Sequence, residues 1–411
     1  MNLTELAELI GYGENSGVEF KRDDIRPEKL ADEMAALLNL EGGHLLLGIE
    51  DDGTVSGLTR DTKIAEEWVM SIARNNLRPA AIPYWETIEW EPGRIVGVIS
   101  LPPDAPDKPY KAKRASAWVT KVRVGTTSRD ATDDEEMRLY QQSGRLQYDR
   151  KPVPGTDLKD LDLRRLTNYF RDFRQQECPD QADEDNWQRL LINTEFMYLD
   201  GDRAIPSAGG LLLFGNKPNR YLPHAGINAV VYSGTEKDYA AKERLLLRGP
   251  AVTLFSANGD VIETGIIEQA LEFVRRHTNV SASIDEGGTR QEQWDYPPDA
   301  IREAIVNAIA HRDYTITVTD IELSIYSDRL EVISPGRLPN TVTVEKMRAG
   351  YRASRNELIK ETLRDYKYLE ATGLGIPRKI VAGMFDHNGT DPDLIEDDER
   401  FTVRLWKERK N

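Results

Sequence analysis

Apolar and polar positions along the first part of the chain alternate between the spacing of helices and that of strands. Apolar residues recur at helical spacing in "LTELAELIGYG" (3–13) and again over residues 27–40. The run "HLLLGIEDDGTVSGL" (44–58) predicts two strands around an Asp-Gly turn. Further elements are predicted as a helix over 62–76 and strands near 84–91, 94–101 and 117–124. This part of the chain is therefore expected to be α+β.

Two polar stretches predict where this first domain ends. The acidic cluster "DDEEM" (133–137) and the Pro-Gly stretch "DRKPVPGTD" (149–157) separate it from a mixed region. That region has a helix in "DLRRLTNYFRDFRQQ", strands in "AGGLLLFG" (208–215) and "GINAVVYSG" (226–234), and an amphipathic helix over 262–277. We expect an α+β protein with three parts: residues 1–148, a mixed middle region over 149–290, and an α/β sandwich over 291–411.

Composition places the chain among soluble globular proteins. It has 411 residues and a net charge of −16, and its longest apolar runs are too short to cross a bilayer. Cys178 is the single cysteine, which excludes an internal disulfide framework and a thiolate zinc site. The N-terminus has no basic segment of the kind that begins a signal peptide. We therefore expect a cytoplasmic protein with no membrane partner.

One strip of the acidic chain is basic. Residues 108–129, "KPYKAKRASAWVTKVRVGTTSR", hold seven Lys and Arg and no acid, with Tyr110 and Trp118 interleaved. Such a strip is typical of a surface that contacts the phosphates of nucleic acid. The alternative is a basic edge strand that discourages aggregation. The candidate phosphate contacts are Lys111, Lys113, Arg114, Lys121, Arg123 and Arg129.

A second candidate site lies on a helix predicted in "PPDAIREAIVNAIAHRDY" (297–314). Glu303, Asn307 and His311 recur every four residues and share one helix face. An Asn offers an oxygen to Mg²⁺, and a Glu one turn away can orient or deprotonate water, so the pair suits phosphoryl chemistry. Solvated helix faces carry the same residue types, so the pattern alone is weak.

Three later segments strengthen this interpretation: "DRLEVISPGRLP" (328–339), "YRASRNELIKETL" (351–363) and "EATGLGIPRKIV" (370–381). In this order they resemble the GHKL (Bergerat-type) ATP-binding fold over about 295–405. The resemblance is closer to the divergent branch of RecG-related proteins and predicted transcriptional regulators. It implies ATP as a ligand. It assigns water and Mg²⁺ to Glu303 and Asn307, the adenine-side turn to Gly336, the phosphate loop to Gly373 and Gly375, and the lid to Arg355 with Ser354 and Asn356.

Two positions depart from the family pattern. Ser334 stands where the family has an acidic or amide residue that contacts adenine, and Arg337 stands where it has a second glycine. The resemblance therefore implies nucleotide binding more than fast hydrolysis. No Gly-x-x-x-x-Gly-Lys-Ser/Thr loop of a helicase motor is present. A GHKL-type kinase or chaperone-like ATPase ranks third, because no phospho-acceptor histidine segment precedes the pocket.

The N-terminal stretch "ENSGVEFK" (14–21) and the later "GIEDDG" (48–53) collect carboxylates beside a lysine. Glu19 and Lys21 lie two apart on a predicted strand and so point to the same face. If Glu14, Glu19 and Asp51 converge, a Mg²⁺ or Mn²⁺ ion between them would suit phosphodiester cleavage, with Lys21 stabilising the phosphate. The alternative is a surface ion pair and an ordinary acidic turn.

These residues resemble the AlbA-type domain of Schlafen proteins over about residues 10–130. In nuclease members of that family two glutamates and an aspartate form the cutting site. The resemblance places them at Glu14, Glu19 and Asp51, with Asp52 as the alternative third residue.

Two functions follow as hypotheses. The first is an ATP-controlled, Mg²⁺- or Mn²⁺-dependent nuclease that cuts tRNA-like RNA or DNA, in stress or anti-phage defence as the family resemblance suggests. The alternative is a non-catalytic, ATP-responsive DNA-binding transcriptional regulator. The carboxylate trio favours the first, since a regulator does not need three acids facing a polyanion. An ATP-gated protein of this kind is expected to be a homo-oligomer.

Overall fold

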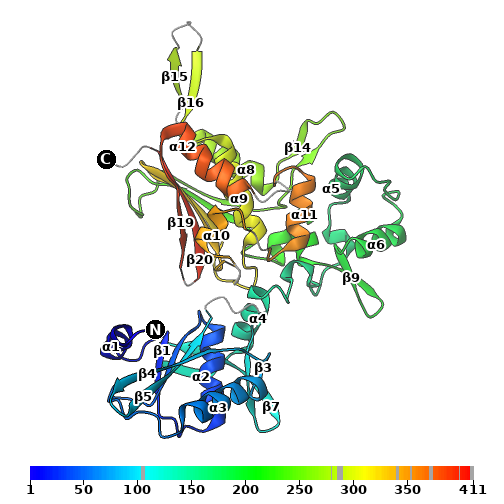
Figure 1. The fold of residues 1–411 in the computed structure, drawn as a ribbon. Coiled ribbons are helices and arrows are strands. Elements are labelled where there is room, and N and C mark those ends of the chain that lie inside the picture. Colours follow the sequence, from blue (N-terminus) through cyan, green and yellow to red (C-terminus); the bar gives the residue numbers. More distant parts are fainter. Residues whose placement is uncertain are drawn as a thin grey trace. The chain divides into compact units, whose positions relative to one another are not determined.

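The computed structural model divides the chain into two compact units, Met1–Leu146 and Gln147–Asn411 (Figure 1). The residues described are 1–102, 107–278, 280–284, 290–338, 342–351, 354–369, 374–397 and 399–407, without the side chains of 280–284 and 290–293. Among them, no helix is both long enough and apolar enough to span a bilayer.

The N-terminal unit contains two four-stranded sheets. The first has the order β1-β2-β5-β4, built from β1 (Val18–Lys21), β2 (Gly43–Leu47), β5 (Arg94–Leu101) and β4 (Tyr84–Glu91). The second has the order β3-β6-β7-β8, built from β3 (Leu77–Arg78), β6 (Lys111–Arg114), β7 (Ala117–Val124) and β8 (Thr127–Asp130). The helices are α1 (Leu3–Tyr12), α2 (Pro27–Asn39), α3 (Thr62–Asn75) and α4 (Asp133–Gln142). Only β1 and β2 pair in parallel in the first sheet.

Both faces of the first sheet are buried, which explains the continuous apolar run of β2. Leu45 and Leu47 point into a core shared with α2 and α3, and Leu46 points into a second core shared with Leu6 of α1. Alternate strand residues face opposite sides of a sheet, so a strand covered on both sides needs apolar residues at successive positions.

The second unit is built on one six-stranded sheet with the order β12-β11-β17-β18-β20-β19. Its strands are β12 (Glu243–Leu247), β11 (Ile227–Val231), β17 (Ile321–Ile325), β18 (Arg329–Pro335), β20 (Arg400–Trp406) and β19 (Asp393–Glu396). Only β11 and β17 pair in parallel in this sheet. Helices α8 (Ile266–His277), α9 (Pro298–His311) and α12 (Gly383–Asn388) lie against the sheet (Figure 1).

The helices cover one face of this sheet only. Leu323 and Val332 lie in the core with α8 and α9. On the opposite face the carboxylate of Glu331 accepts hydrogen bonds from Arg329 (2.8 Å) and Arg404 (2.7 Å). Glu331 and Ile333 are nevertheless only 5% and 7% exposed, so this face of β18 is covered by neighbouring side chains and is not solvated.

The remaining elements of the second unit belong largely to the region expected as a separate middle part. They are α5 (Leu163–Asn168) with a π-helical turn (Tyr169–Phe173), α6 (Glu184–Asn193), β9 (Met197–Asp200), β10 (Arg203–Pro206), α7 (Ala208–Phe214), β13 (Leu254–Phe255) and β14 (Val261–Glu263). The hairpin β15 (Val280–Ile284) and β16 (Arg290–Trp294) follows, and then α10 (Val344–Arg348), α11 (Glu357–Asp365) and the π-helix η5 (Gly375–Ala382). Because β11 and β12 share a sheet and a core with the C-terminal strands, residues 149–290 and 291–411 form one compact unit.

The segment "AGGLLLFG" is helix α7, although its apolar run predicted a strand. The Ser207 side chain accepts a hydrogen bond from the Gly210 N–H and so caps a helix. A Cβ on Gly210 would fall 2.4 Å from the Phe196 carbonyl oxygen, so the glycine permits close packing of the helix. Every residue of α7 is buried, and a short, wholly buried helix has the same apolar pattern as a buried strand.

Candidate functional site

The N-terminal carboxylates lie beside strand β1, which places Glu19 and Lys21 on one face. Glu19 is 4% exposed, and its two oxygens bind Lys21 Nζ (2.5 Å) and Arg123 Nη2 (2.6 Å). Glu14 Oε1 accepts a hydrogen bond from the Phe20 N–H (2.9 Å) and lies 3.6 Å from Lys21 Nζ. Burial disfavours the charged lysine, but the Glu19 and Glu14 carboxylates outweigh it and raise the pKa of Lys21.

The sequence analysis missed Glu33, which joins this cluster from α2. Its Oε2 accepts hydrogen bonds from Ser128 Oγ (2.5 Å) and Arg123 Nη1 (3.3 Å). Burial raises the pKa of Glu33, and the nearby Glu19 charge adds to the rise. Glu14, Glu19, Lys21, Glu33 and Arg123 are called the carboxylate cluster below. No local pattern of the sequence singles out Glu33, because its partners Arg123 and Ser128 lie about 90 residues further along the chain.

Asp51 is not part of the carboxylate cluster. It is exposed in the turn after β2, and no hydrogen bond or ion pair between described residues joins it to Glu14 or Glu19. Asp52 Oδ1 accepts a hydrogen bond from the Thr54 N–H (2.9 Å), which lowers the pKa of Asp52. Within the described residues, no group of three or more His, Cys, Asp or Glu side chains is placed to hold a metal ion. The trio predicted for Mg²⁺ or Mn²⁺ therefore does not form a metal site in the described structure, since Asp51 is exposed in the turn after β2 and the oxygens of Glu19 are bound by Lys21 and Arg123.

The basic strip divides between the two faces of the second sheet. Lys121 and Arg123 lie buried on the face that α2 covers, where they pair with Asp32 (3.7 Å) and Glu19 respectively. Arg114 also pairs with Asp32. Lys121 and Arg123 are thus buried and paired with acids, which does not fit their predicted contact with phosphates, whereas Arg114 is half-buried beside Asp32 on the same inner face.

Three residues of the strip remain on the outer face. Lys113 is exposed, Lys111 is half-buried and pairs with Glu136, and Arg129 is exposed and pairs with Glu135 (2.7 Å). The Arg129 guanidinium lowers the pKa of Glu135 to about 2. Lys111, Lys113 and Arg129 are thus the members of the strip that can meet a ligand.

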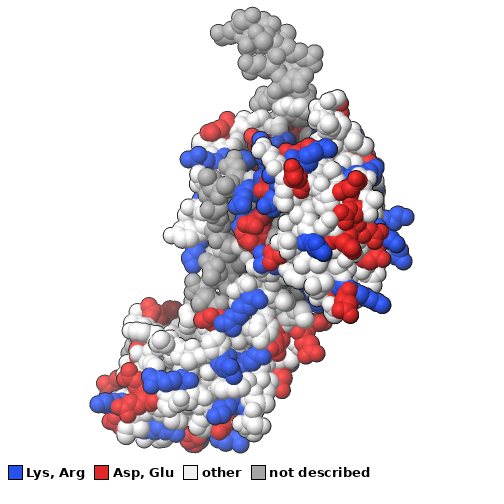
Figure 2. Space-filling model, turned by 90° about the vertical axis from the view of Figure 1, so that its right-hand side faces the viewer, with Lys and Arg blue, Asp and Glu red and all other residues white. Residues whose placement is uncertain are grey.

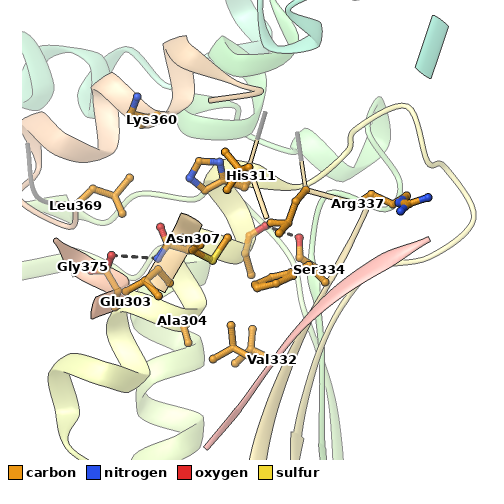
Figure 3. Close-up of a pocket in the computed structure, with 18 of the residues that line it drawn as sticks. Glu303, Ala304, Asn307, His311, Val332, Ser334, Arg337, Lys360, Leu369 and Gly375 are labelled. Atoms are coloured by element: carbon orange, nitrogen blue, oxygen red, sulfur yellow. Dashed lines mark hydrogen bonds between the residues drawn. The ribbon is translucent and has the colours of Figure 1, made fainter. Parts of the chain in front are cut away.

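The second site is a cavity in the C-terminal unit between α9, the sheet and α11 (Figure 3). Its wall combines apolar side chains from α9, β18 and β20 with polar groups at one end. The polar lining includes Glu303, Asn307, His311, Ser334, Lys360 and Arg364. This combination suits a ligand with one flat apolar part and one charged part.

Glu303 and Asn307 form a pair on α9. The Asn307 amide donates to Glu303 Oε1 (3.0 Å), and Lys379 Nζ lies 3.7 Å from Glu303 Oε2. Glu303 is only 4% exposed. In Figure 3 the amide oxygen of Asn307 points away from Glu303, which leaves it available to a ligand.

Gly375 begins η5 directly against this pair. A Cβ at Gly375 would fall 1.8 Å from Glu303 Oε1, so any side chain here would displace the Glu303 carboxylate. Gly336 has φ +108°, and a Cβ there would fall 2.5 Å from Arg355 Nη1. Gly373, predicted as the other phosphate-loop glycine, lies outside the described residues.

Arg355 does not line the cavity, although it was expected in a lid. It is 2% exposed and donates hydrogen bonds to the backbone oxygens of His311 (3.1 Å) and Arg337 (2.7 Å). The neighbouring Asn356 donates to the carbonyls of Ala310 (3.0 Å) and Arg312 (2.8 Å) at the end of α9. Arg355 and Asn356 therefore hold the cavity wall in place and do not touch its contents.

The cavity offers different chemistry at its two ends. Ser334 Oγ donates its proton to the Ala308 carbonyl (2.9 Å), so it offers a ligand only lone pairs, which suit the amino group of an adenine. At the other end α11 contributes Lys360 and Arg364, which the sequence analysis did not assign. Burial lowers the pKa of His311 to about 4, and the Lys360 and Arg355 charges add to the effect, so His311 is neutral at pH 7.

The group implied by the GHKL resemblance, ATP with Mg²⁺, fits these residues. The lining places Lys360 and Arg364, cations of the kind that meet phosphates, in one cavity with the Asn307 amide oxygen, a ligand type that suits Mg²⁺.

The fold and its two sites define an α+β protein. A small unit holds a carboxylate–cation cluster, and a larger α/β unit holds a cavity with an apolar wall and polar groups at one end. Residues 14–132 match the family "Schlafen, AlbA_2", and residues 319–405 match the family "Putative ATP-dependent DNA helicase recG C-terminal". The chain is therefore a fusion of a Schlafen AlbA-type domain with a recG-related, ATPase-like domain. These domains indicate nucleic-acid binding associated with ATP. Glu303 and Asn307 precede the second matched range.

Two solved structures are similar to the chain at low sequence identity. The DIP2311 protein from Corynebacterium diphtheriae is 20% identical with a TM-score of 0.45, covering 99% of this chain and 80% of that one. The N-terminal domain of a RecG-related protein from Nitrosomonas europaea is 23% identical with a TM-score of 0.25, covering 32% and 94%. No curated protein matches the chain. The family assignment rests on the two sequence matches.

Proposed function

We propose that this protein is an ATP-responsive nucleic-acid-binding regulator. Its N-terminal unit would bind RNA or DNA on the outer face of the second sheet, and its C-terminal unit would bind ATP in the cavity. The observation that carries the proposal is the cavity, where α9 supplies Glu303 and Asn307 and α11 supplies Lys360 and Arg364. ATP with its Mg²⁺ would bring the negative charge that these groups complement.

The cavity is connected to the start of its unit, which supports control by ATP. Asp149, the third residue of the C-terminal unit, accepts a hydrogen bond from the Ile359 N–H (3.2 Å) in the first turn of α11. Lys360 and Arg364 lie on the same helix. Phosphates that bind them and shift α11 would therefore also shift Asp149, in the segment that follows the N-terminal unit. A homo-oligomer remains part of this proposal, as a second means by which ATP would act.

The carboxylate cluster supports a regulator more than a nuclease. Lys21 and Arg123 bind the two oxygens of Glu19. A metal ion bound there would displace Arg123, and this buried guanidinium would then lose its carboxylate partners. Cleavage is the second candidate, favoured by the gathering of Glu14, Glu19 and Glu33 around Lys21. As a cutting enzyme the protein would serve stress or anti-phage defence, as the Schlafen resemblance implies.

The test measures binding of labelled RNA, single-stranded DNA and duplex DNA by fluorescence anisotropy, with and without Mg²⁺–ATP. Lys360→Ala and Arg364→Ala are expected to weaken ATP binding about 10- to 100-fold, as for a lost hydrogen bond to a charged group. They should also abolish the effect of ATP on nucleic-acid affinity. Arg302→Ala, an exposed cation on α9 outside the cavity, is the charge-matched control.

The same mixtures are run on denaturing gels with Mg²⁺ or Mn²⁺. If the RNA and DNA remain uncut on these gels, the result supports the regulator over the nuclease. Cutting that disappears in both Glu14→Gln and Glu19→Gln, with unfolding curves unchanged, would overturn it in favour of the nuclease. An unchanged response to ATP in the Lys360 and Arg364 variants would reject the cavity as the regulatory site.

A further inference from the structure

A cleft in the N-terminal unit combines aromatic rings with cations. It lies where β3, β6, β7 and α4 meet. The residues that line it are Arg78, Pro79, Pro109, Lys111, Trp118, Tyr140 and Arg145. Three of the seven are cations in a chain whose net charge is −16, so the cleft differs in charge from the protein as a whole.

The pairing of strands explains why these side chains meet. Arg78 lies opposite Lys111, and Lys113 lies opposite Trp118. Residues directly opposite in antiparallel strands project to the same face, and so do residues two apart in one strand. Arg78, Lys111, Lys113 and Trp118 therefore share the outer face, opposite the face where Arg114 and Lys121 bind α2 acids.

The two aromatic rings are half-buried and each has a cation beside it. The Arg78 guanidinium lies 5.9 Å from the centre of the Trp118 ring, and Lys111 Nζ lies 5.6 Å from the centre of the Tyr140 ring. A half-buried ring is held in place by its neighbours and still presents an accessible surface to a ligand. Such rings are the platforms on which unstacked nucleobases stack.

The cations around the rings are placed to meet phosphates. Lys111 pairs with Glu136, and Arg145 pairs with Asp107 (3.0 Å). Arg78 and Lys113 are exposed, with no ion pair recorded between them and any acid in the described part of the chain. Figure 2 shows Lys and Arg side chains on the visible face of the N-terminal unit.

We propose that this cleft binds one unstacked base of a single-stranded nucleic acid on Trp118 and Tyr140, with Arg78, Lys111, Lys113 and Arg145 contacting the flanking phosphates. The inference rests on the proposed function and specifies its substrate as single-stranded. In a duplex the bases are stacked on one another, so their faces are not accessible to an aromatic side chain. A single strand, a loop or a flipped base offers both the face and the phosphates.

The test uses the full-length protein and three labelled 20-nucleotide probes: a single strand, the matching duplex, and an abasic strand with the same phosphates. Trp118→Ala is expected to weaken single-strand binding about 5- to 100-fold, as for the loss of one base–aromatic stack. Binding of the duplex and of the abasic strand should change less than about twofold. Trp118→Phe should restore most of the single-strand affinity, because a ring remains.

Two control variants separate stacking from charge and from folding. Tyr84→Ala removes an exposed aromatic of the same unit that does not line the cleft, and it should leave every probe unaffected. Arg78→Ala should weaken all three probes, since each carries phosphates.

Each outcome decides the inference. If Trp118→Ala lowers the affinity for the single strand and for the abasic strand equally, the inference is overturned, since the tryptophan would then contribute to binding without contacting a base. Unchanged single-strand binding in Trp118→Ala, with measurable binding by the wild type, would also overturn it. Wild-type protein that binds none of the probes would instead reject the nucleic-acid part of the proposed function.

Discussion

At the scale of single residues, the contact between Gly375 and Glu303 is the most restrictive feature of the cavity. The place for a Cβ on Gly375 is already filled by the Glu303 carboxylate, which also binds Asn307. The start of η5 can lie against α9 only because the side chain is absent. Adding one methyl group at Gly375 would therefore change both the stability of the unit and the shape of the cavity.

Gly375→Ala is expected to lower ATP affinity at least about 10-fold and the free energy of unfolding by about 1–3 kcal/mol, because the methyl group displaces Glu303 or η5. Isothermal titration with ATP and urea unfolding measure the two effects. Gly383→Ala, in the adjoining helix α12, is the matched control. Its nearest neighbouring atom would be 3.6 Å from the new Cβ, so binding and stability should stay at wild-type values or rise slightly.

A double variant tests the stated cause. Glu303→Ala with Gly375→Ala removes the clashing carboxylate and should recover stability without recovering ATP binding. If Gly375→Ala alone binds ATP as wild type does, the packing argument fails.

At the scale of elements, helix α11 is joined to the start of its unit through Asp149. The Asp149 side chain is fully buried and accepts the Ile359 N–H in the first turn of α11. Burial raises its pKa to about 6, even though the α11 backbone donors oppose the rise. A buried carboxyl at this helix terminus makes the unit sensitive to pH.

The stability of the second unit is therefore expected to fall as pH rises from about 4 to about 6. The folded state binds the Asp149 proton more tightly than the unfolded state, so the contribution is complete below the unfolded pKa and is lost as pH rises through the folded pKa. The fall should amount to about 3 kcal/mol. Asp149→Asn should remove it, because the amide still accepts the Ile359 N–H but does not ionise.

Urea unfolding between pH 4 and pH 7 measures this prediction. Asp157→Asn is the control, since Asp157 caps a short helix on the surface and not in the core. A wild-type curve that is flat over this pH range would contradict the assignment, as would an Asp149→Asn curve with the wild-type slope.

The alternation of β-strands also acts at this scale. Successive residues of a strand face opposite sides of the sheet. In β6 and β7, Lys111, Lys113 and Trp118 therefore point outward, and Arg114 and Lys121 point toward α2. The basic strip of the sequence is thus divided between the outer face of the sheet and an inner layer of ion pairs with α2.

At the scale of the whole molecule, the two compact units are expected to unfold in two separate thermal transitions. ATP should raise only the transition of Gln147–Asn411, because the cavity lies wholly within that unit. At 100 times the dissociation constant, the ligand stabilises its unit by about 2.7 kcal/mol, which raises Tm by several degrees. Scanning calorimetry with and without Mg²⁺–ATP measures the shift.

The same scans identify which unit binds nucleic acid. A single-stranded oligonucleotide should raise the melting temperature of the N-terminal unit. At the same ATP concentration, Lys360→Ala should reduce the ATP-induced stabilisation of the second unit to about 0.4–1.4 kcal/mol without changing the effect of the oligonucleotide. One shared transition that moves as a whole with ATP would show that the units unfold together, contrary to this prediction.

The sequence by itself determined the features that depend on local pattern. The spacing of Glu303 and Asn307 on one helix face, the strands β2, β4, β5 and β7 and the two family resemblances were readable from the chain, because helix and strand periodicities are properties of neighbouring residues. The second strand predicted in residues 44–58 is only an isolated bridge between Ile49 and Val55, and the short strands β3, β6 and β8 were not predicted. The basic strip was also visible, although its division between two faces required the pairing of β6 with β7.

Only the tertiary structure decided which of the predicted groups meet. Asp51 stays outside the carboxylate cluster and Glu33 enters it, since α2 and β7 bring residues far apart in sequence to one place. Arg355 turns inward to backbone carbonyls, and Lys360 and Arg364 reach the cavity instead. Residues 149–290 complete the C-terminal unit because β11 pairs with β17 across the chain. Local sequence fixes which face of an element is apolar, but long-range packing selects the partner for each charge.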